Sequence, residues 1–242
     1  MTFERSPGPP AEPAPTPQSG REPTPVQIRL QILSTEHWSL LASRSLAWNE
    51  SFSRAGMFLT TLSGSIVALS LIAGVDGFHD PFYVVALVVL PVDLFVGIGT
   101  WLRMGATNYH DAIAVAGMNR IRAAYLEIAP ELAPYFVMGV HDDAPGIGIT
   151  MAVPPGTAPF VHLIAGTPTL VMVLNAIVAG AIGAIAASRF AGTAALVTIL
   201  LAGVIAAIVL AVQMSSARRK IGRGQRGLTP MFPTPPGDRT GA

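Results

Sequence analysis

The stretch FYVVALVVLPVDLFVGIGTWL, residues 82–102, contains a single formal charge, Asp93, in 21 positions. At ~1.5 Å per residue, a helix of this length covers the ~30 Å hydrocarbon core of a bilayer. Every backbone N–H and C=O in hydrocarbon must be bonded within its own segment, which a helix achieves and an isolated strand does not. The stretch therefore predicts a membrane-spanning helix.

Three further runs have the same character, at residues 55–75, 169–187 and 190–214, and none of them contains a charged residue. The composition agrees: 51% of the chain is hydrophobic and 12% is charged, compared with about 25% charged residues in soluble proteins. A soluble helical domain is the alternative, but buried core helices are seldom this long without a charge. We expect an all-α membrane protein with four transmembrane helices and a cytoplasmic helical extension.

The basic residues predict the orientation of the spans. The two short loops that join spans one and two and spans three and four contain one basic residue, Arg189. All the others precede span one, follow span four or lie between spans two and three, so the positive-inside rule places both termini in the cytoplasm, at the plasma membrane. These residues are Arg5, Arg21, Arg29, Arg44, Arg54, Arg103, Arg120, Arg122, Arg218, Arg219, Lys220, Arg223, Arg226 and Arg239.

Both ends of the chain are predicted to be disordered. Residues 1–24 are rich in proline and nearly free of large apolar side chains, and residues 215–242 are basic and rich in Gly and Pro. Five basic residues follow span four closely, where each gains about 1 kcal/mol against anionic lipid headgroups. Nucleic-acid binding is the alternative for this cluster, but a membrane anchor is the simpler interpretation and we predict no nucleic-acid partner. The cluster is Arg218, Arg219, Lys220, Arg223 and Arg226.

A cytoplasmic helix is predicted to begin at Thr24, with Pro25 at its first position and Gln27 placed to complete a capping box. Apolar residues then recur at intervals that place them on one stripe of the helix, which we expect to run directly into span one. The stripe consists of Val26, Leu30, Leu33, His37, Leu41, Trp48 and Phe52.

A second helix is predicted after span two, and Pro130 should stop it near Ala129. Its apolar residues alternate spacings of three and four, as in a coiled-coil seam: Met118, Ile121, Tyr125, Ile128, Leu132 and Tyr135. Residues 25–136 would then form a cytoplasmic helical pair joined to spans one and two, and 137–166 an irregular connector. The 118–135 helix either binds a cytoplasmic partner or a second copy, or packs within the chain.

The segment MNRIRAAYLEIAPELAPYF, residues 118–136, resembles a stretch of multi-pass membrane proteins from high-GC, actinobacterial-type bacteria that are themselves uncharacterised. The resemblance covers less than a tenth of the chain. It implies a membrane protein and no particular activity.

Asp93 is the residue of greatest functional interest, because an ionisable group at membrane depth is costly. Counted from the cytoplasmic face, Ser63 and Ser65 of span one and Asn175 of span three lie within ~5 Å of the depth of Asp93. The four side chains are predicted to form a polar cluster. They either line a path for a proton or cation, or supply an interhelical hydrogen bond worth about 1 kcal/mol.

Small residues predict which helix faces approach closely in lipid. Span one has Thr61, Gly64, Ser65 and Ala68 on one face, and span two has Asp93, Gly97 and Thr100. Spans three and four contain the ladders Ala176, Gly180, Ala184 and Gly203, Ala207, Ala211. We expect these two spans to form a tight hairpin; the alternative is a homo-oligomer through one ladder.

Catalytic chemistry finds little support. Gly222, Gly224 and Gly227 match a dinucleotide-binding spacing but follow a membrane span instead of a strand. His110 and His141 are too few for a metal site, and the chain has no cysteine. We therefore predict no enzymatic activity, metal or cofactor. The prediction is a structural or partner-binding component of the cytoplasmic membrane, with a channel or transporter subunit using Asp93 as the alternative.

Overall fold

The computed structural model describes residues 24–151, 166–192, 194–227 and 229–236. Within these ranges the chain is helical and contains no strand. The elements are α1 (Pro25–Asp76), α2 (Asp80–Ile128), the 3₁₀ helix η1 (Pro130–Tyr135), α3 (Ala144–Thr150), α5 (Thr167–Ala191) and α6 (Ala195–Gly227).

Four helices in the described part of the chain, α1, α2, α5 and α6, are long and apolar enough to cross a membrane. The predicted all-helical fold with four span-length helices is confirmed. The boundary between the third and fourth spans differs from the prediction, because α5 runs on through Phe190 and Ala191. Gly192, with a left-handed φ of 56°, makes the turn instead of Ser188 and Arg189, since glycine has no Cβ to oppose that conformation.

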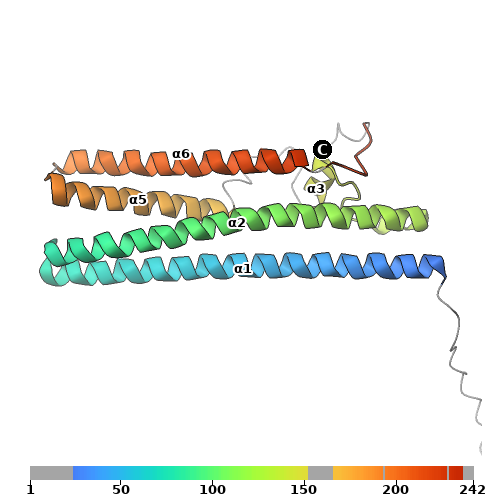
Figure 1. Cartoon of the computed structure of the whole chain (residues 1–242), viewed down its shortest axis with the longest axis horizontal. Coiled ribbons are helices and arrows are strands. Elements are labelled where there is room, and N and C mark those ends of the chain that lie inside the picture. The colour runs from blue at the N-terminus through green and yellow to red at the C-terminus, as the bar shows by residue number, and fades with distance from the viewer. Residues whose placement is uncertain (1–23, 152–165, 193, 228, 237–242) are drawn as a thin grey trace, which may run out of the picture.

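The helices form two antiparallel pairs (Figure 1). α1 packs on α2, α2 packs on α5, and α5 packs on α6, so α5 lies between α2 and α6 along its own length. The α1–α2 loop and the α5–α6 loop lie at one end of the molecule, and the start of α1 lies at the other. This arrangement agrees with two hairpins threaded in the same direction.

α1 is a single helix of 52 residues, about 78 Å long, which is more than twice the thickness of a bilayer core. The predicted capping box is present: the Gln27 N–H donates to Thr24 Oγ1 (3.3 Å) and the Thr24 N–H donates to Gln27 Oε1 (2.7 Å). No break separates the N-terminal part of α1 from its apolar part, so the predicted continuity is confirmed.

α2 has 49 residues and remains helical through Pro91. It ends at Ile128, where Ala129 is the C-cap and Pro130 begins η1, as the sequence predicts. Proline disfavours the helical conformation in the residue before it, which places the break at Ala129.

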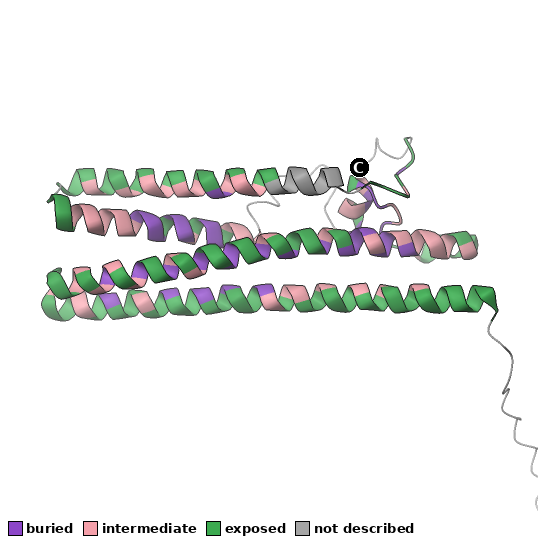
Figure 2. Ribbon diagram, in the orientation of Figure 1, coloured by how far each residue is buried: buried purple, intermediate pink, exposed green. Residues whose placement is uncertain are grey.

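One seam of α1 faces α2 along almost the whole length of α1. Residues of α1 spaced by three and four positions are less exposed than their neighbours and mark this seam (Figure 2). The seam passes without interruption from the N-terminal part into the apolar part, so the two parts pack as one coiled pair. Its members are Leu33, His37, Leu40, Arg44, Ala47, Ser51, Ala55, Phe58, Leu62, Ser65, Leu69 and Ile72.

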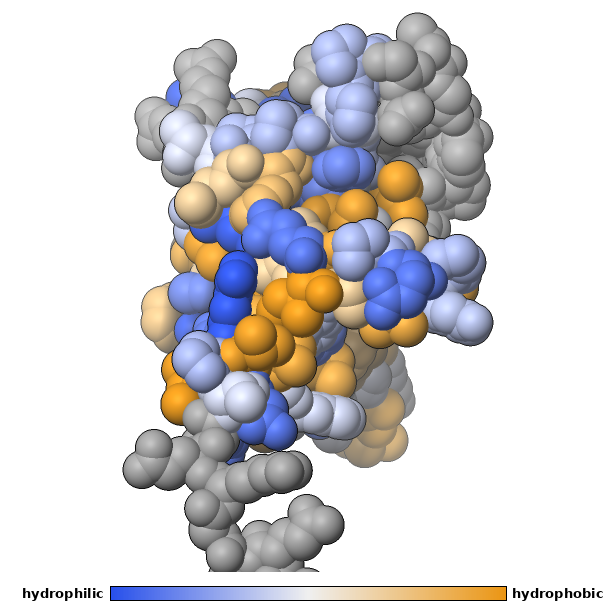
Figure 3. All heavy atoms as spheres, turned by 90° about the vertical axis from the view of Figure 1, so that its right-hand side faces the viewer, coloured by the Kyte–Doolittle hydropathy of each residue, from blue (hydrophilic) through white to orange (hydrophobic). Residues whose placement is uncertain are grey.

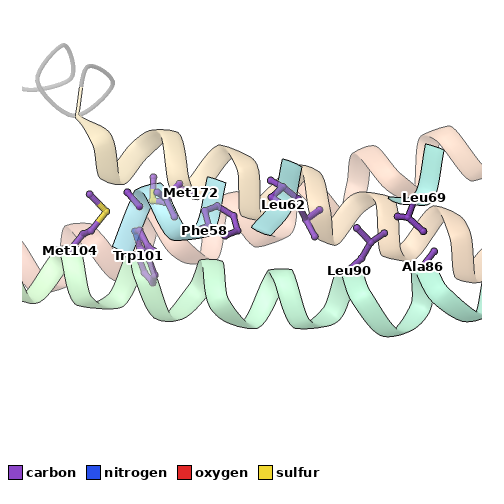
Figure 4. Close-up of a cluster of buried hydrophobic side chains, with 11 residues drawn as sticks. Phe58, Leu62, Leu69, Ala86, Leu90, Trp101, Met104 and Met172 are labelled. Atoms are coloured by element: carbon purple, nitrogen blue, oxygen red, sulfur yellow. The ribbon is translucent and has the colours of Figure 1, made fainter. Parts of the chain in front are cut away.

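The apolar core lies where α1, α2 and α5 meet (Figure 4). Phe58 and Met172 are almost fully buried there, and such large side chains hold the three helices together through many dispersion contacts. The labelled members of the cluster are Phe58, Leu62, Leu69, Ala86, Leu90, Trp101, Met104 and Met172.

Polar contacts hold the register of α1 and α2 in the less apolar half of the pair. The Ser51 hydroxyl donates to Thr107 Oγ1 (2.8 Å) in a buried site, and the Arg44 guanidinium makes two hydrogen bonds to the Asp111 carboxylate. Ion pairs at the surface follow the same register, with Arg103 on Glu50 (2.6 Å) and Arg29 on Glu127 (3.3 Å).

The predicted apolar stripe of α1 is only partly covered by α2. Leu33, His37 and Trp48 are half-buried, whereas Val26, Leu30, Leu41 and Phe52 are exposed. The Arg44–Asp111 and Ser51–Thr107 contacts rotate the packed face away from the centre of the stripe. On the second stripe Met118 and Ile121 are buried and Tyr125 and Ile128 half-buried, but Leu132 and Tyr135 are exposed because the helix has ended.

The connector and the C-terminal part are more regular than predicted. α3 lies inside the expected irregular connector, and Asp143 caps it by accepting from the Gly146 N–H (3.2 Å). α6 continues to Gly227, so the first half of the expected disordered tail is helix. Residues 229–236 are hydrogen-bonded to Asp142 and Asp143. The proline-rich residues 1–23 lie outside the described part.

Candidate functional site

Asp93 and Asn175 are buried at the interface between α2 and α5, with 3% and 0% of their surface exposed. Asn175 lies against Gly97 of α2, where a Cβ would overlap both the Asn175 amide oxygen and the Phe58 ring of α1. The three helices therefore meet at one point, and the missing side chain at Gly97 makes room for the amide.

Among the described residues, the buried side-chain atoms without a hydrogen-bond partner are Asp93 Oδ2, both polar atoms of Asn175 and, on α6, Gln213 Oε1. Leaving such a buried group unsatisfied costs about 1–3 kcal/mol, so native proteins seldom keep one without a reason. Asp93 is one helical turn, ~6 Å of rise, from Gly97 on the same buried face of α2. Water or a small cation can satisfy a buried carboxylate or carboxamide, and a proton can also satisfy the carboxylate.

Ser63 and Ser65 do not join Asp93 and Asn175. Ser63 is exposed, and the Ser65 hydroxyl donates to the Thr61 carbonyl of its own helix (3.0 Å). Large apolar residues occupy the face of α1 that packs on α2, and the small residues Thr61, Gly64 and Ala68 point away. Of the predicted contact face of span one, only Ser65 lies on the seam and the other three residues are exposed, whereas Asp93, Gly97 and Thr100 of span two are all buried.

The α5–α6 hairpin is tight at Gly180, where a Cβ would lie 2.7 Å from the Ala202 carbonyl oxygen and 3.3 Å from the Ala206 Cβ. Ala176 and Gly180 of the first predicted ladder are buried. The second ladder, Gly203, Ala207 and Ala211, is exposed. In the hairpin the predicted ladder of α5 therefore packs on the face of α6 that contains Ala202 and Ala206, and not on the predicted ladder of α6.

The loops at one end of the molecule are joined through Arg189. Its guanidinium pairs with the Asp80 carboxylate (3.0 Å) and lies over the Tyr83 ring (5.9 Å to the centroid). This contact connects the start of α2 to the end of α5, and it involves the one basic residue of the two short loops.

A second buried polar site is centred on Asp142, whose side chain is fully buried. Its carboxylate accepts from Arg120 Nε (2.6 Å), the Met231 N–H (2.9 Å) and the Phe232 N–H (2.8 Å). Burial by itself raises the pKa of Asp142, but the hydrogen bonds from the two amides and the guanidinium outweigh it and the pKa is lowered.

Asp143 extends this site. It accepts from the Thr234 N–H (2.8 Å) and the Thr234 hydroxyl (2.7 Å) while capping α3. Burial raises the pKa of Asp143, yet the Thr234 and Gly146 hydrogen bonds lower it overall. Both groups are therefore held as carboxylates at neutral pH.

Asn119 of α2 fixes the backbone that carries the two carboxylates. Its Nδ2 donates to the carbonyl oxygens of His141 (2.7 Å) and Gly146 (3.1 Å). Its Oδ1 accepts from Thr150 Oγ1 (2.8 Å) and Arg122 Nη1 (2.8 Å). Sequence reasoning missed this site, since Arg120 lies 22 positions from Asp142 and the other partners, Met231, Phe232 and Thr234, lie about 90 positions away. An aspartate before Ala-Pro, a helix-capping pattern, is the one local signal.

In the described residues no three acidic, histidine or cysteine side chains are grouped as metal ligands. Arg218 and Arg219 of the predicted basic cluster are exposed on α6, whereas the side chains of Lys220, Arg223 and Arg226 lie outside the described part. No protein family, curated protein or solved structure matches this chain.

Proposed function

We propose that this chain is an integral component of the cytoplasmic membrane, with both termini in the cytoplasm, that binds a protein partner through its helical extension. The extension consists of the N-terminal part of α1, residues 25–54, and the matching part of α2, residues 103–128. At ~1.5 Å per residue it reaches about 45 Å beyond the apolar spans. The lipid bilayer is the first partner, and Arg218 and Arg219 are placed to meet anionic headgroups.

The observation that carries this proposal is an apolar flank on the extension, formed by Leu30, Trp38, Leu41, Trp48 and Phe52. Leu30, Leu41 and Phe52 are spaced by eleven residues, which is three helical turns, so they lie on one side of α1. Trp38 is 69% exposed and Phe52 is 53% exposed. The contacts between α1 and α2 are already satisfied by the seam, so the flank remains available.

The exposed aromatic side chains of the flank are typical of a protein–protein interface. Tryptophan is among the residues that contribute most to protein–protein binding, phenylalanine is enriched at interfaces, and an exposed apolar surface rimmed by polar residues marks interaction sites. Figure 3, which views the end of the molecule that carries the extension, shows hydrophobic residues exposed among hydrophilic ones. Trp48 and Phe52 stack with ring centroids 5.6 Å apart, so part of the flank is preorganised.

The test replaces Trp38 and Phe52 with serine and measures the mass of the lipid-embedded particle purified from its native membrane. We expect the unaltered chain to carry protein mass beyond its own 25.2 kDa and the double variant to lose it. Ser43→Ala, at another exposed position of α1, is the matched control. A particle that contains one chain, for both the unaltered protein and the double variant, contradicts the proposal.

A second candidate is a channel or transporter subunit that moves a proton or cation past Asp93. The unpartnered atoms of Asp93 and Asn175 favour it, because a bound water or ion satisfies both groups. Proteoliposomes test it directly: flux that is present in the unaltered protein and abolished by Asp93→Asn supports transport. The absence of flux in the unaltered protein favours the partner-binding component.

A further inference from the structure

Residues 229–236, Thr-Pro-Met-Phe-Pro-Thr-Pro-Pro, lie along the site formed by Asp142 and Asp143. Four of the eight residues are proline and have no N–H. Of the four remaining N–H groups, those of Met231, Phe232 and Thr234 donate to the two carboxylates. The site therefore binds nearly every backbone donor that the segment possesses.

The contacts also select the residue at position 234. Thr234 is 7% exposed and its hydroxyl donates to Asp143 (2.7 Å), whereas the Met231 side chain is 68% exposed. Two carbonyl groups of the segment also accept hydrogen bonds, both of 3.2 Å. The Asp142 N–H donates to the Phe232 carbonyl, and Arg120 Nη2 donates to the Thr229 carbonyl. Proline on both sides of Thr234 restricts the unbound segment to extended conformations, which lowers the entropy lost on docking.

The site is built without help from the segment. Asp143 is fixed as the cap of α3, and the loop before it is held by the Asn119 amide through the His141 and Gly146 carbonyls. Thr150 closes this network by donating to Asn119 and accepting from the Gly139 N–H. The carboxylates are therefore preorganised to receive N–H groups, as in a binding site.

We propose that Asp142, Asp143 and Arg120 form a recognition site for an extended, proline-flanked threonine segment, and that residues 229–236 occupy it as an exchangeable ligand. The site is separate from the apolar flank and from Asp93, so it stands whether or not those proposals hold. Occupancy by residues 229–236 ties the end of α6 to α2 and α3, elements that α6 otherwise contacts little.

The same chain contains a second ligand of this class. Residues 15–17 repeat the Pro-Thr-Pro triplet of residues 233–235, and Ala14 supplies the N–H that corresponds to Phe232. Pro13 stands where Met231 stands and has no N–H, so one hydrogen bond to Asp142 is lost. We expect this segment to bind about tenfold more weakly. The third triplet, at residues 23–25, is engaged in capping α1.

Hydrogen exchange on the full chain in lipid nanodiscs tests the proposal, because a fragment spanning residues 229–236 reports only the Met231, Phe232 and Thr234 amides. The Thr234→Val chain, whose own ligand is weakened, is mixed with a synthetic peptide of residues 229–236. We expect the chain's own amides to exchange at least tenfold faster at saturating peptide. A peptide of residues 11–18 should require about tenfold higher concentration than the 229–236 peptide to produce the same increase in exchange. The Thr16→Val form of the 11–18 peptide should require a higher concentration still.

The carboxylates are tested by Asp142→Asn with Asp143→Asn, since asparagine retains the capping ability that α3 needs. Exchange of the three amides should rise at least tenfold, whereas Glu36→Gln, which removes an exposed carboxylate from α1, should leave it unchanged. The peptide experiment does not depend on whether the double variant folds. Exchange that stays unchanged at saturating peptide overturns the proposal and makes residues 229–236 a fixed part of the fold.

Discussion

Gly97 is the position where the contact of α1, α2 and α5 depends most on a single residue. A Cβ there would overlap the Asn175 amide and the Phe58 ring, both fully buried, so neither group can move aside freely. We expect Gly97→Ala to destabilise the protein by about 1–3 kcal/mol, as overpacking does.

Gly99→Ala is the matched control for this prediction, because nothing lies within 4 Å of a Cβ at Gly99 on the same helix. Unfolding in mixed detergent measures both variants. Equal stability of the two would show that α5 does not pack on α2 at this point.

Asp142 and Asp143 make the docking of residues 229–236 depend on pH. Both pKa values are lowered in the folded state, so the stabilisation is present above the ordinary carboxyl pKa of about 3.9 and is lost as the pH falls through the folded values. We expect a spin label at Met231→Cys to become mobile as the pH drops below about 4. The chain has no native cysteine, so this label is unique.

Other groups near these carboxylates do not reverse the sign of the prediction. Arg120 pairs with Asp142, and the electrostatic effect of His141 also lowers the pKa of Asp143. In the Asp142→Asn, Asp143→Asn chain the label should already be mobile at pH 7 and show no transition. Release on raising the pH above neutrality would contradict this account.

At the level of residues, the sequence predicts a polar group when the cost of burying it is visible locally. Asp93 and Asn175 stand out in apolar runs, and both are buried together. Ser63 and Ser65 do not join them, because a serine hydroxyl in a helix can bond to the carbonyl four residues earlier, as Ser65 does. Asp142 and Asp143 give no such signal, since their ligand is distant in the sequence.

The α1–α2 pair depends on the buried contact between Arg44 and Asp111. The Asp111 side chain is 5% exposed, so Arg44→Leu leaves a carboxylate without its partner in a nearly dry site. We expect a loss of about 2 kcal/mol, less than the 3–5 kcal/mol of a fully buried pair because Arg44 is partly exposed.

Replacing both Arg44 and Asp111 with leucine should restore most of this stability, since no unpaired charge remains. Arg29→Gln, which breaks an exposed pair with Glu127, should change stability by less than about 0.5 kcal/mol. Chemical unfolding followed by circular dichroism measures each variant. A double-leucine variant as unstable as Arg44→Leu would argue against an unpaired buried carboxylate as the cause of the loss.

The positions where helices begin and end follow from neighbouring residues in the sequence, whereas the face of a helix that packs on another helix does not. The capping box at Thr24 and the break before Pro130 were predictable, because both depend on neighbouring residues. The face of α1 that packs on α2 was not, since Arg44, Ser51 and their distant partners decide it. The length of α6 was also underestimated, because a basic, glycine-containing segment can continue a helix already formed by its apolar part.

The whole molecule exposes far more apolar surface than water tolerates. The apolar window of α6 is the most hydrophobic of the four and none of it is buried. Leu200, Val204 and Ile208 are each more than half exposed along that helix. Hydrocarbon is the solvent that such a surface requires, which favours four membrane crossings as the central claim.

Single cysteines test that claim directly, because the natural chain has none. The substitutions are His79→Cys and Phe190→Cys at the loop end, and Ser45→Cys and Met231→Cys at the opposite end, all at exposed positions. In intact spheroplasts a membrane-impermeant maleimide should label positions 79 and 190, and label positions 45 and 231 only after permeabilisation. Labelling of position 45 or 231 from outside, or a chain that stays monodisperse in buffer without detergent, would contradict the account.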